Sequence, residues 1–129
     1  MNKIIVEVSI GELLDKISIL EIKQEKIKDP EKLKFVSEEH SVLKEQFDNN
    51  IKPDTKIDNL FQSLKEINAK LWVIEDDKRQ CEKDKDFGEK FIKLSRDVHF
   101  LNDDRAKIKL EINNHTGSVI KEIKEYTSY

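Results

Sequence analysis

The chain of 129 residues has the length of a single domain, and 40% of its residues are charged while 36% are hydrophobic. Its 24 basic and 27 acidic residues are interspersed and leave a net charge of −3, which argues against a nucleic-acid-binding protein, because such proteins usually carry a basic excess or stripe. Three glycines and two prolines are too few for a loop-rich or all-β fold, so the composition favours long helices with charged outer faces.

The sequence also predicts where the protein is found. Nothing in it approaches the roughly 18 consecutive apolar residues of a transmembrane helix, and Glu7 interrupts the apolar stretch near the N-terminus, so neither a membrane span nor a signal peptide is expected. Cys81 is the one cysteine, which excludes an intrachain disulfide and favours a reducing compartment. We therefore expect a cytoplasmic protein without a nucleic-acid or membrane partner.

The N-terminus predicts an extended arm followed by a helix. Residues 3–8, KIIVEV, are mostly β-branched, as in a short strand or arm. Ser9 and Glu12 have the spacing of a capping box, in which the serine hydroxyl accepts a hydrogen bond from the backbone N–H of Glu12 and the Glu12 carboxylate reaches back. A first helix is therefore expected over residues 10–28.

A second helix is expected after almost no loop. Asp29 can cap its N-terminus, and Pro30 suits the first helical position because its missing N–H costs little there. The pattern predicts a helix over residues 30–48, antiparallel to the first. An Asn- and Pro-containing linker after it is the clearest connector in the chain.

The second half of the chain predicts another helical hairpin. Apolar residues at helical spacing indicate a third helix over residues 55–82, capped by Asp54 or Thr55. A fourth helix is expected over residues 87–116, where the apolar stripe is long and regular.

Further signals mark the ends of the fourth helix. Asp86 and Glu89 have the spacing of a second capping box, and Gly117 is placed to end the helix in a left-handed conformation. Residues 118–129 are expected to form an irregular tail.

Two helical hairpins joined by a short linker predict one all-α domain over residues 1–129. It should be either a four-helix bundle or a long antiparallel coiled coil that dimerises. Long helices with modest apolar content bury more surface when they pair, so a homodimer or higher oligomer is expected.

Arg105 lies in the apolar stripe of the fourth helix, where the helical period calls for an apolar residue. Its guanidinium should be at least partly buried, and a buried charge must be paired. The predicted partner is a carboxylate of Asp15 or Glu12 on the first helix, or of Glu66 on the third.

A candidate ligand site surrounds this arginine. In a bundle whose helix ends are level, the candidate residues are Arg105, Asn102, Lys109, Lys16, Asp15 and Glu12. Such a mixture could hold a carboxylate or phosphate, since arginine grips these anions with two hydrogen bonds. The alternative is a layer of salt bridges that fixes the register of the helices.

A second candidate cluster lies on the third helix and consists of Trp72, Glu75, Asp76 and Arg79. Trp72 is the only tryptophan and lies one position off the apolar stripe. A tryptophan with arginine and acids beside it can be a hot spot for a protein partner. The alternative is a tryptophan half buried at the seam of a hairpin or dimer.

The remaining reactive residues indicate no metal, cofactor or catalytic centre. His99 and Asp103 are four residues apart, a spacing that can ligate a metal but more often forms a surface ion pair, and no Glu-x-x-His pair of the di-iron type exists. Cys81 has no base beside it, so a bland thiol is expected.

Three blocks of sequence resemble a known family: VEVSIGELLDKISILEIK, LWVIEDDKR and FGEKFIKLSRDVHFLNDDRAKIKLEIN. They are similar to a family of small uncharacterised bacterial and phage proteins, a domain of unknown function, and this resemblance implies no activity, substrate or cofactor. A weaker likeness, at the level of the fold, is to the all-helical chorismate mutases, which hold a dianion with inward-facing Arg and Lys.

Two functions follow from these patterns. The leading hypothesis is a small helical module that binds a partner or itself without catalysis. The runner-up is a small enzyme or ligand-binding protein that holds an anionic metabolite around Arg105. An anion-sized space beside Arg105 would favour the runner-up, and carboxylates that fill the space would favour the leading hypothesis.

Overall fold

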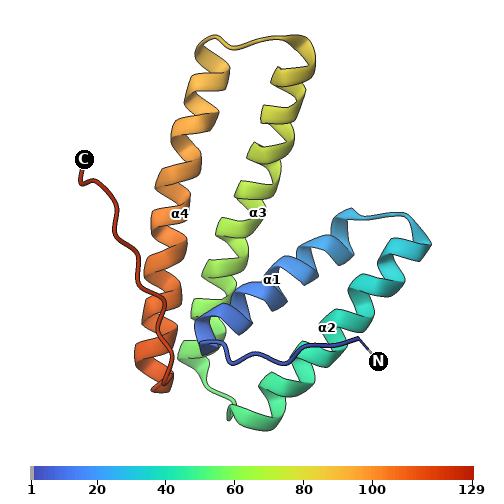
Figure 1. Cartoon of the computed structure of the whole chain (residues 1–129), viewed down its shortest axis with the longest axis vertical. Helices are drawn as coiled ribbons and strands as arrows, with labels where there is room; N and C mark the ends of the chain where they lie inside the picture. Colours follow the sequence, from blue (N-terminus) through green and yellow to red (C-terminus); the bar gives the residue numbers. More distant parts are fainter. Residues whose placement is uncertain (1) are drawn as a thin grey trace.

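The computed structural model describes residues 2–129, of which four segments are helical: α1 (Ile10–Lys26), α2 (Pro30–Asn50), α3 (Thr55–Asp84) and α4 (Glu89–Thr116). About 75% of the chain is helical, and no strand occurs among the described residues. Figure 1 shows the helices as two antiparallel hairpins, α1–α2 and α3–α4. The predicted all-α class is therefore confirmed.

Side-chain caps begin three of the four helices as predicted. The hydroxyl of Ser9 accepts from the backbone N–H of Glu12 at 3.1 Å. The Glu12 carboxylate does not reach back to complete the capping box, because it accepts from Lys109 instead. Asp29 caps α2 with Pro30 in its first turn, and Asp54 caps α3. Caps of this kind satisfy backbone N–H groups that have no partner inside the helix.

The predicted capping box before α4 is wrong. Helix α4 begins at Glu89, and its N-cap, Gly88, forms no side-chain hydrogen bond. Asp86 instead accepts from the backbone N–H of Gly88 at 3.2 Å. The reason lies one residue earlier: Lys85 ends α3 in the left-handed conformation (φ 56°), so Asp86 belongs to the loop that reverses the chain.

The other end of α4 is as predicted. Gly117 adopts φ 67° and donates its backbone N–H to the carbonyl of Asn113. A residue with a side chain would be strained in this left-handed conformation, which glycine adopts freely.

The two hairpins meet through α1. Helix α1 packs against all three other helices, whereas α2 packs only against α1 among the described residues. Figure 1 shows the α1–α2 hairpin leaning away from α3–α4, so that the hairpins meet at the lower end and the upper half of α3–α4 has no helix against it. The arrangement is an open bundle.

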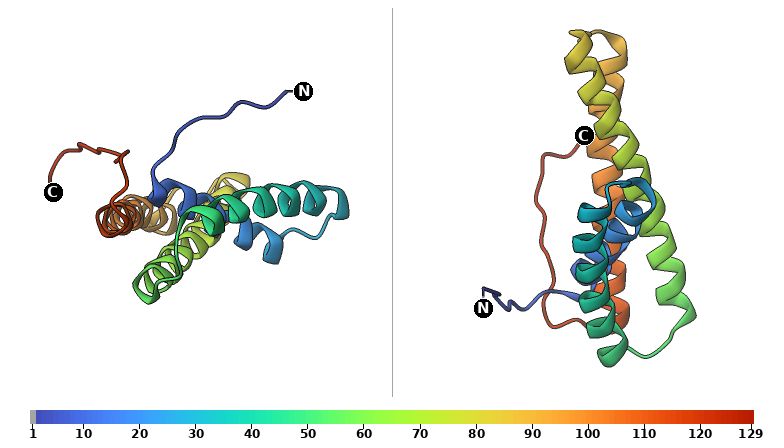
Figure 2. Two further views of the ribbon diagram at one scale, coloured as in Figure 1. Left: turned by 90° about the horizontal axis from the view of Figure 1, so that it is seen from below. Right: turned by 90° about the vertical axis from the view of Figure 1, so that its right-hand side faces the viewer.

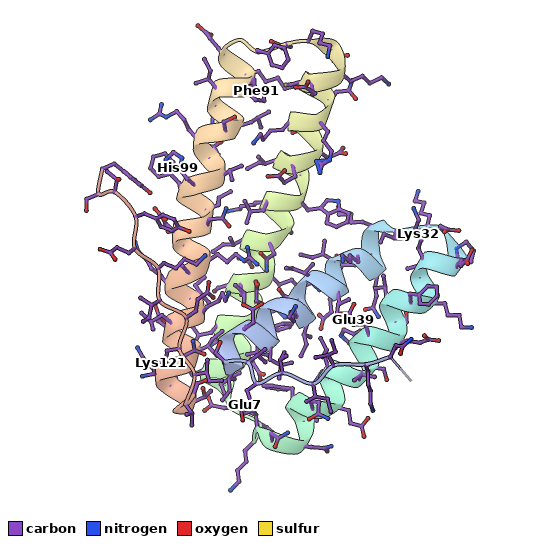
Figure 3. The ribbon with its side chains drawn as sticks, viewed as in Figure 1. Glu7, Lys32, Glu39, Phe91, His99 and Lys121 are labelled. Carbon is purple, nitrogen blue, oxygen red and sulfur yellow. The ribbon has the colours of Figure 1, made fainter. Side chains whose placement is uncertain are left out.

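The core is correspondingly small and lies where the hairpins meet, with buried Leu14, Ile17, Ile57, Leu64 and Ile112. Helix α2 contributes no buried residue, and Cys81 is the one buried residue between positions 69 and 108. Figure 3 shows Phe91 and His99 on this uncovered part of α4. Many apolar side chains therefore remain partly exposed.

The two ends of the chain have no regular structure. We call residues 2–8 the arm and residues 118–129 the tail. Figure 2 shows both on the same side of the layer of helices, with the arm projecting from the start of α1 and the tail returning along α4. None of the helices in residues 2–129 is both long and apolar enough to cross a lipid bilayer.

Candidate functional site

A set of mostly buried polar side chains crosses the core and joins α1 to α3 and α4. We call it the polar layer; its members are Glu12, Asp15, Ser18, Asn68, Arg105, Lys109 and Asn113. Helical spacing places its α1 members on one face, three residues apart, and its α4 members on another, four residues apart. Three helices therefore contribute to one polar cluster.

Asp15 is the centre of the polar layer and is 1% exposed. One carboxylate oxygen, Oδ1, accepts from Nε of Arg105 at 2.9 Å and from Nδ2 of Asn68 at 2.8 Å. The other oxygen, Oδ2, accepts from a terminal nitrogen of the same guanidinium. The prediction that Arg105 pairs with a carboxylate of α1 is confirmed, and the pair is of the strong two-bond type.

The electrostatics of Arg105 follow from this pair. Hydrogen bonding to Asp15 raises the pKa of the Arg105 guanidinium above its usual value, although burial opposes the rise. The side chain of Arg105 is 29% exposed, so its charge is partly shielded from water. Its remaining edge donates to Oδ1 of Asn102 at 3.4 Å.

Ser18 and Asn68 complete the surroundings of the buried carboxylate. The Ser18 hydroxyl donates to the backbone carbonyl of Asp15 at 2.7 Å and accepts from Nδ2 of Asn68 at 2.8 Å. In the described part of the chain, no buried side-chain nitrogen or oxygen lacks a hydrogen-bond partner. The polar layer is therefore satisfied by the protein's own groups.

Lys109 carries the second buried cation. Its ammonium donates to Glu12 at 2.6 Å and to Glu122 of the tail at 2.7 Å, and it lies 3.9 Å from Oδ2 of Asp15. Burial lowers the pKa of Lys109, but the hydrogen bonds to Glu12 and Glu122 outweigh that effect and leave the pKa above its ordinary value. Lys109 thus ties the tail to the polar layer.

The hydrogen bond between Lys109 and Glu122 should make docking of the tail depend on pH. Hydrogen bonding from Lys109 holds the pKa of the Glu122 carboxyl below its ordinary value of 4.5. A lowered pKa stabilises the docked tail above pH 4.5, and this contribution is lost as the pH falls through the folded-state pKa. Carbon NMR should therefore give a Glu122 midpoint below 4.5 that rises in Lys109→Gln.

The matched control for this titration is Lys107→Gln, which removes an exposed lysine of the same helix. The Glu122 midpoint should be the same there as in the wild type. A wild-type midpoint at 4.5 or above would show that Lys109 does not hold the tail in solution.

Close backbone contact brings α1 onto α4 beside the polar layer. The backbone N–H of Gly11 donates to Oδ1 of Asn113 at 2.7 Å, and that of Ile10 donates to the Ser118 hydroxyl at 3.2 Å. A Cβ atom at Gly11 would lie 2.6 Å from the carbonyl oxygen of Lys109. The two helices can approach this closely only because residue 11 is glycine.

The structure brings most of the predicted ligand-site residues together. Asp15, Glu12, Arg105 and Lys109 form the ion pairs just described, and Asn102 adjoins them. Lys16 is exposed and takes part in none of the hydrogen bonds or ion pairs of the layer within the described chain.

The residues of α1 and α4 that face each other differ from those expected for parallel helix axes. Level helix ends would place Arg105 near Leu20, whereas Arg105 meets Asp15, because α1 is inclined to α4 and not parallel to it (Figure 1). Glu66, a predicted alternative partner, is exposed on α3.

Sequence reasoning missed three members of this region: Ser18, Gly11 and Glu122. Ser18 lies three residues after Asp15 on the same face of α1, a signal that was available. Glu122 lies in an irregular tail, where no periodicity predicts a contact.

The Trp72 cluster lines a groove of about 390 Å³ beside the polar layer, which we call the Trp72 groove. Its apolar walls are Ile19 and Ile22 of α1 with Leu71 and Trp72 of α3. Glu75, Asp76 and Arg79 lie along it, and Asn68 and Arg105 connect it to the polar layer. The two clusters predicted from sequence therefore meet at one place.

The charges beside the Trp72 groove have no partners of their own. Within residues 2–129, Glu75, Asp76 and Arg79 form no ion pair within 4.0 Å. This contrasts with the saturated polar layer next to it. The groove thus combines an apolar floor with unpaired charges of both signs.

The other reactive residues are occupied by packing. The ring of His99 lies 4.4 Å from that of Phe100 and 5.2 Å from that of Tyr129, and the Tyr129 hydroxyl donates to Asp103. Cys81 is buried as a free thiol. The described residues contain no group of three or more His, Cys, Asp or Glu that could hold a metal ion.

Comparison with protein families places the chain. A family model matches residues 4–129, which include most of the arm and the whole tail. The chain belongs to a family of unknown function, DUF6165. This family match confirms the resemblance to an uncharacterised family, but it bears neither on a bacterial or phage source nor on the likeness to chorismate mutases. No curated protein and no solved structure matches the chain.

Proposed function

We propose that this chain is a non-catalytic helical assembly module that pairs with a second copy of itself through the Trp72 groove. The observation that carries the proposal is the exposed surface of 9506 Å². A typical monomeric protein of 15.2 kDa exposes about 7,100 Å². The chain therefore exposes far more surface than a protein of its size that functions alone.

The excess, about 2,400 Å², is large enough for a stable dimer, since standard interfaces bury about 800 Å² on each partner and obligate homodimers more. Part of this excess surface lies on the arm and tail. The rest follows from α2, which has no buried residue, and from the half of α3–α4 that no helix covers. A second copy seated on the Trp72 groove could cover the part of this surface that lies on α3–α4.

The chemistry of the Trp72 groove supports it as the seam. Tryptophan and arginine are the residues most enriched among interface hot spots, and Trp72 here lies on an apolar floor. In a two-fold interface the same patch faces itself, so Arg79 of one copy can meet Glu75 or Asp76 of the other. The unpaired charges are thus self-complementary.

The charges around Arg105 support assembly over anion binding. Asp15 accepts two hydrogen bonds from the guanidinium, while Glu12 and Glu122 accept hydrogen bonds from the ammonium of Lys109. An added carboxylate or phosphate would face three carboxylates there. We therefore assign the polar layer the task of fixing where α1 crosses α3 and α4.

We further propose a cytoplasmic location without nucleic-acid or membrane partners. The one cysteine, Cys81, is a free thiol, which suits a reducing compartment. The near balance of acidic and basic residues supports a protein partner over a polyanion.

Sedimentation tests the self-association directly. The wild type should have twice the mass of the 15.2 kDa chain, and Trp72→Ala should raise the dissociation constant of the dimer at least about 30-fold, the effect of losing a hot spot. The control is Phe35→Ala, which removes an aromatic ring from the exposed face of α2 and should leave the dimer intact.

Circular dichroism would show that both variants keep their helices. A wild type that is monomeric at hundreds of micromolar would contradict self-association. Equal dissociation constants for Trp72→Ala and Phe35→Ala would place the seam elsewhere.

A further inference from the structure

The arm carries apolar side chains that the rest of the described chain leaves uncovered. Ile4 is 90% exposed, Ile5 is 87% exposed and Val6 is 67% exposed. Within the described chain, residues 2–8 form no hydrogen bond through their backbone groups. Figure 2 shows the arm projecting away from the helices. It is therefore an apolar segment whose backbone groups have no partner, and unpaired backbone of this kind invites pairing with another chain.

Side chains alternate between the two faces of an extended arm. One face carries only the apolar side chains of Ile4, Val6 and Val8. The other face carries Lys3, Ile5 and Glu7. The second face has a basic residue, an apolar residue and an acidic residue at equal spacing. When two such faces are aligned antiparallel, each basic residue therefore lies opposite an acidic one.

Two arms can pair antiparallel in one register that uses this symmetry. When Ile5 faces Ile5 of a second copy, Lys3 of each arm faces Glu7 of the other, and Ile4 faces Val6. Opposite charges and β-branched pairs facing each other both stabilise an antiparallel pair. Registers displaced by two residues place a charge opposite Ile5, and those displaced by four place like charges opposite each other.

We propose that the arms of two copies pair as an antiparallel two-stranded ribbon centred on Ile5, which clasps the dimer. The ribbon rests on the proposed self-association, because an isolated two-stranded pair is marginally stable in water. Once the helices have associated, the arms meet at a high effective concentration, and pairing becomes favourable.

The arm is long enough for this role. In a ribbon centred on Ile5, the five residue steps from Ile10 back to Ile5 span about 17 Å when extended. The arm joins α1 at Ile10 through Ser9, and the Trp72 groove lies beside Ile19 and Ile22 of the same helix, about 14–18 Å along its axis. An arm can therefore reach across a seam formed at the groove.

Disulfide trapping tests the register. In Ile5→Cys the two thiols face each other, with Cβ atoms about 5 Å apart, and mild oxidation should link two copies. Val8→Cys is the control: its thiols would be about 20 Å apart in this register. We expect cross-linking to be at least tenfold faster at position 5, whereas equal rates would overturn the ribbon. The wild type, whose Cys81 is buried, serves as the blank.

Charge exchange provides the second test, read by the Ile5→Cys cross-linking rate. Lys3→Glu and Glu7→Lys each place like charges opposite each other at both ends of the ribbon, so each should slow cross-linking about fivefold or more. The double variant, or a mixture of the two single variants, restores opposite charges and should restore the rate. Unchanged rates in the single variants would overturn the proposal.

The failure of the ribbon and that of self-association are distinguishable. A chain without residues 2–8 should still sediment as a dimer at high concentration, because the helical seam remains. A dimeric wild type whose position 5 does not cross-link overturns the ribbon alone, and a monomeric wild type overturns the proposed function. Preferential linking of Ile5→Cys to Ile123→Cys would place the arm on the tail and also overturn the ribbon.

Discussion

Replacing Arg105 with alanine should lower the free energy of unfolding by about 3–5 kcal/mol. The substitution removes both hydrogen bonds that the guanidinium donates to Asp15, a carboxylate that is 1% exposed. A buried carboxylate that loses its cation is among the most destabilising single defects in a folded protein.

Two further variants separate the effect of the Arg105 charge from that of the side chain's volume. Arg105→Met keeps the aliphatic part of the side chain but leaves Asp15 without its arginine. The free energy of unfolding should therefore fall by a similar amount, reduced only by the Lys109 ammonium, which lies 3.9 Å from Oδ2 of Asp15. Asp15→Leu combined with Arg105→Met removes both charges and should recover most of the stability. Asn68 would still donate to Ser18 in that double variant.

Urea unfolding of these variants measures the effect. The matched control is Arg96→Ala, an exposed arginine of the same helix, which should change stability by no more than about 0.5 kcal/mol. If Arg105→Ala unfolds at the same urea concentration as Arg96→Ala, the Asp15 pair contributes nothing in solution. If Arg105→Met is tolerated and an anion raises the melting temperature of the wild type, the anion-binding alternative gains support.

Helix positions could be predicted from the sequence because caps are local. Ser9, Asp29 and Asp54 each bind a backbone N–H two or three residues away, so the residue type alone carries the signal. The same logic failed at Asp86, where the chain reverses through a lysine at positive φ. Lysine rarely adopts that conformation, so the residue type at position 85 does not predict the turn.

The partner of Arg105 could be narrowed from the sequence to Asp15, Glu12 or Glu66, but the choice among them could not be made. An arginine in an apolar stripe requires a carboxylate, and α1 offered few. Which one it meets depends on the angle at which α1 crosses α4, and that angle is a property of the packed helices. The Trp72 groove has the same origin, because its walls come from helices that are far apart in the sequence.

The crossing of α1 and α4 depends on Gly11, and this dependence gives the second large prediction. A Cβ atom at position 11 would lie 2.6 Å from the carbonyl oxygen of Lys109 and 2.9 Å from Oδ1 of Asn113. The Asn113 side chain could turn aside, but a backbone oxygen inside a helix cannot. Gly11→Ala should therefore push α1 away from α4 and lower the free energy of unfolding by about 1–3 kcal/mol.

This loss has the opposite sign to helix propensity, because alanine inside a helix is favoured over glycine by about 1 kcal/mol. The matched control is Gly88→Ala, where a Cβ would meet nothing closer than Oδ1 of Asp86 at 3.4 Å. Alanine is a poorer N-cap than glycine, so urea unfolding should find a loss there that is smaller than that of Gly11→Ala.

Asn113→Ala separates the causes of this loss. It removes the hydrogen bond of 2.7 Å from the Gly11 N–H, and Gly11→Ala in that background should still destabilise the protein because the Lys109 carbonyl remains. A Gly11→Ala protein as stable as Gly88→Ala would mean that the α1 and α4 backbones do not touch. The inclination of α1 would then be set by the Arg105–Asp15 pair alone, and Arg105→Ala should change the crossing as well as the stability.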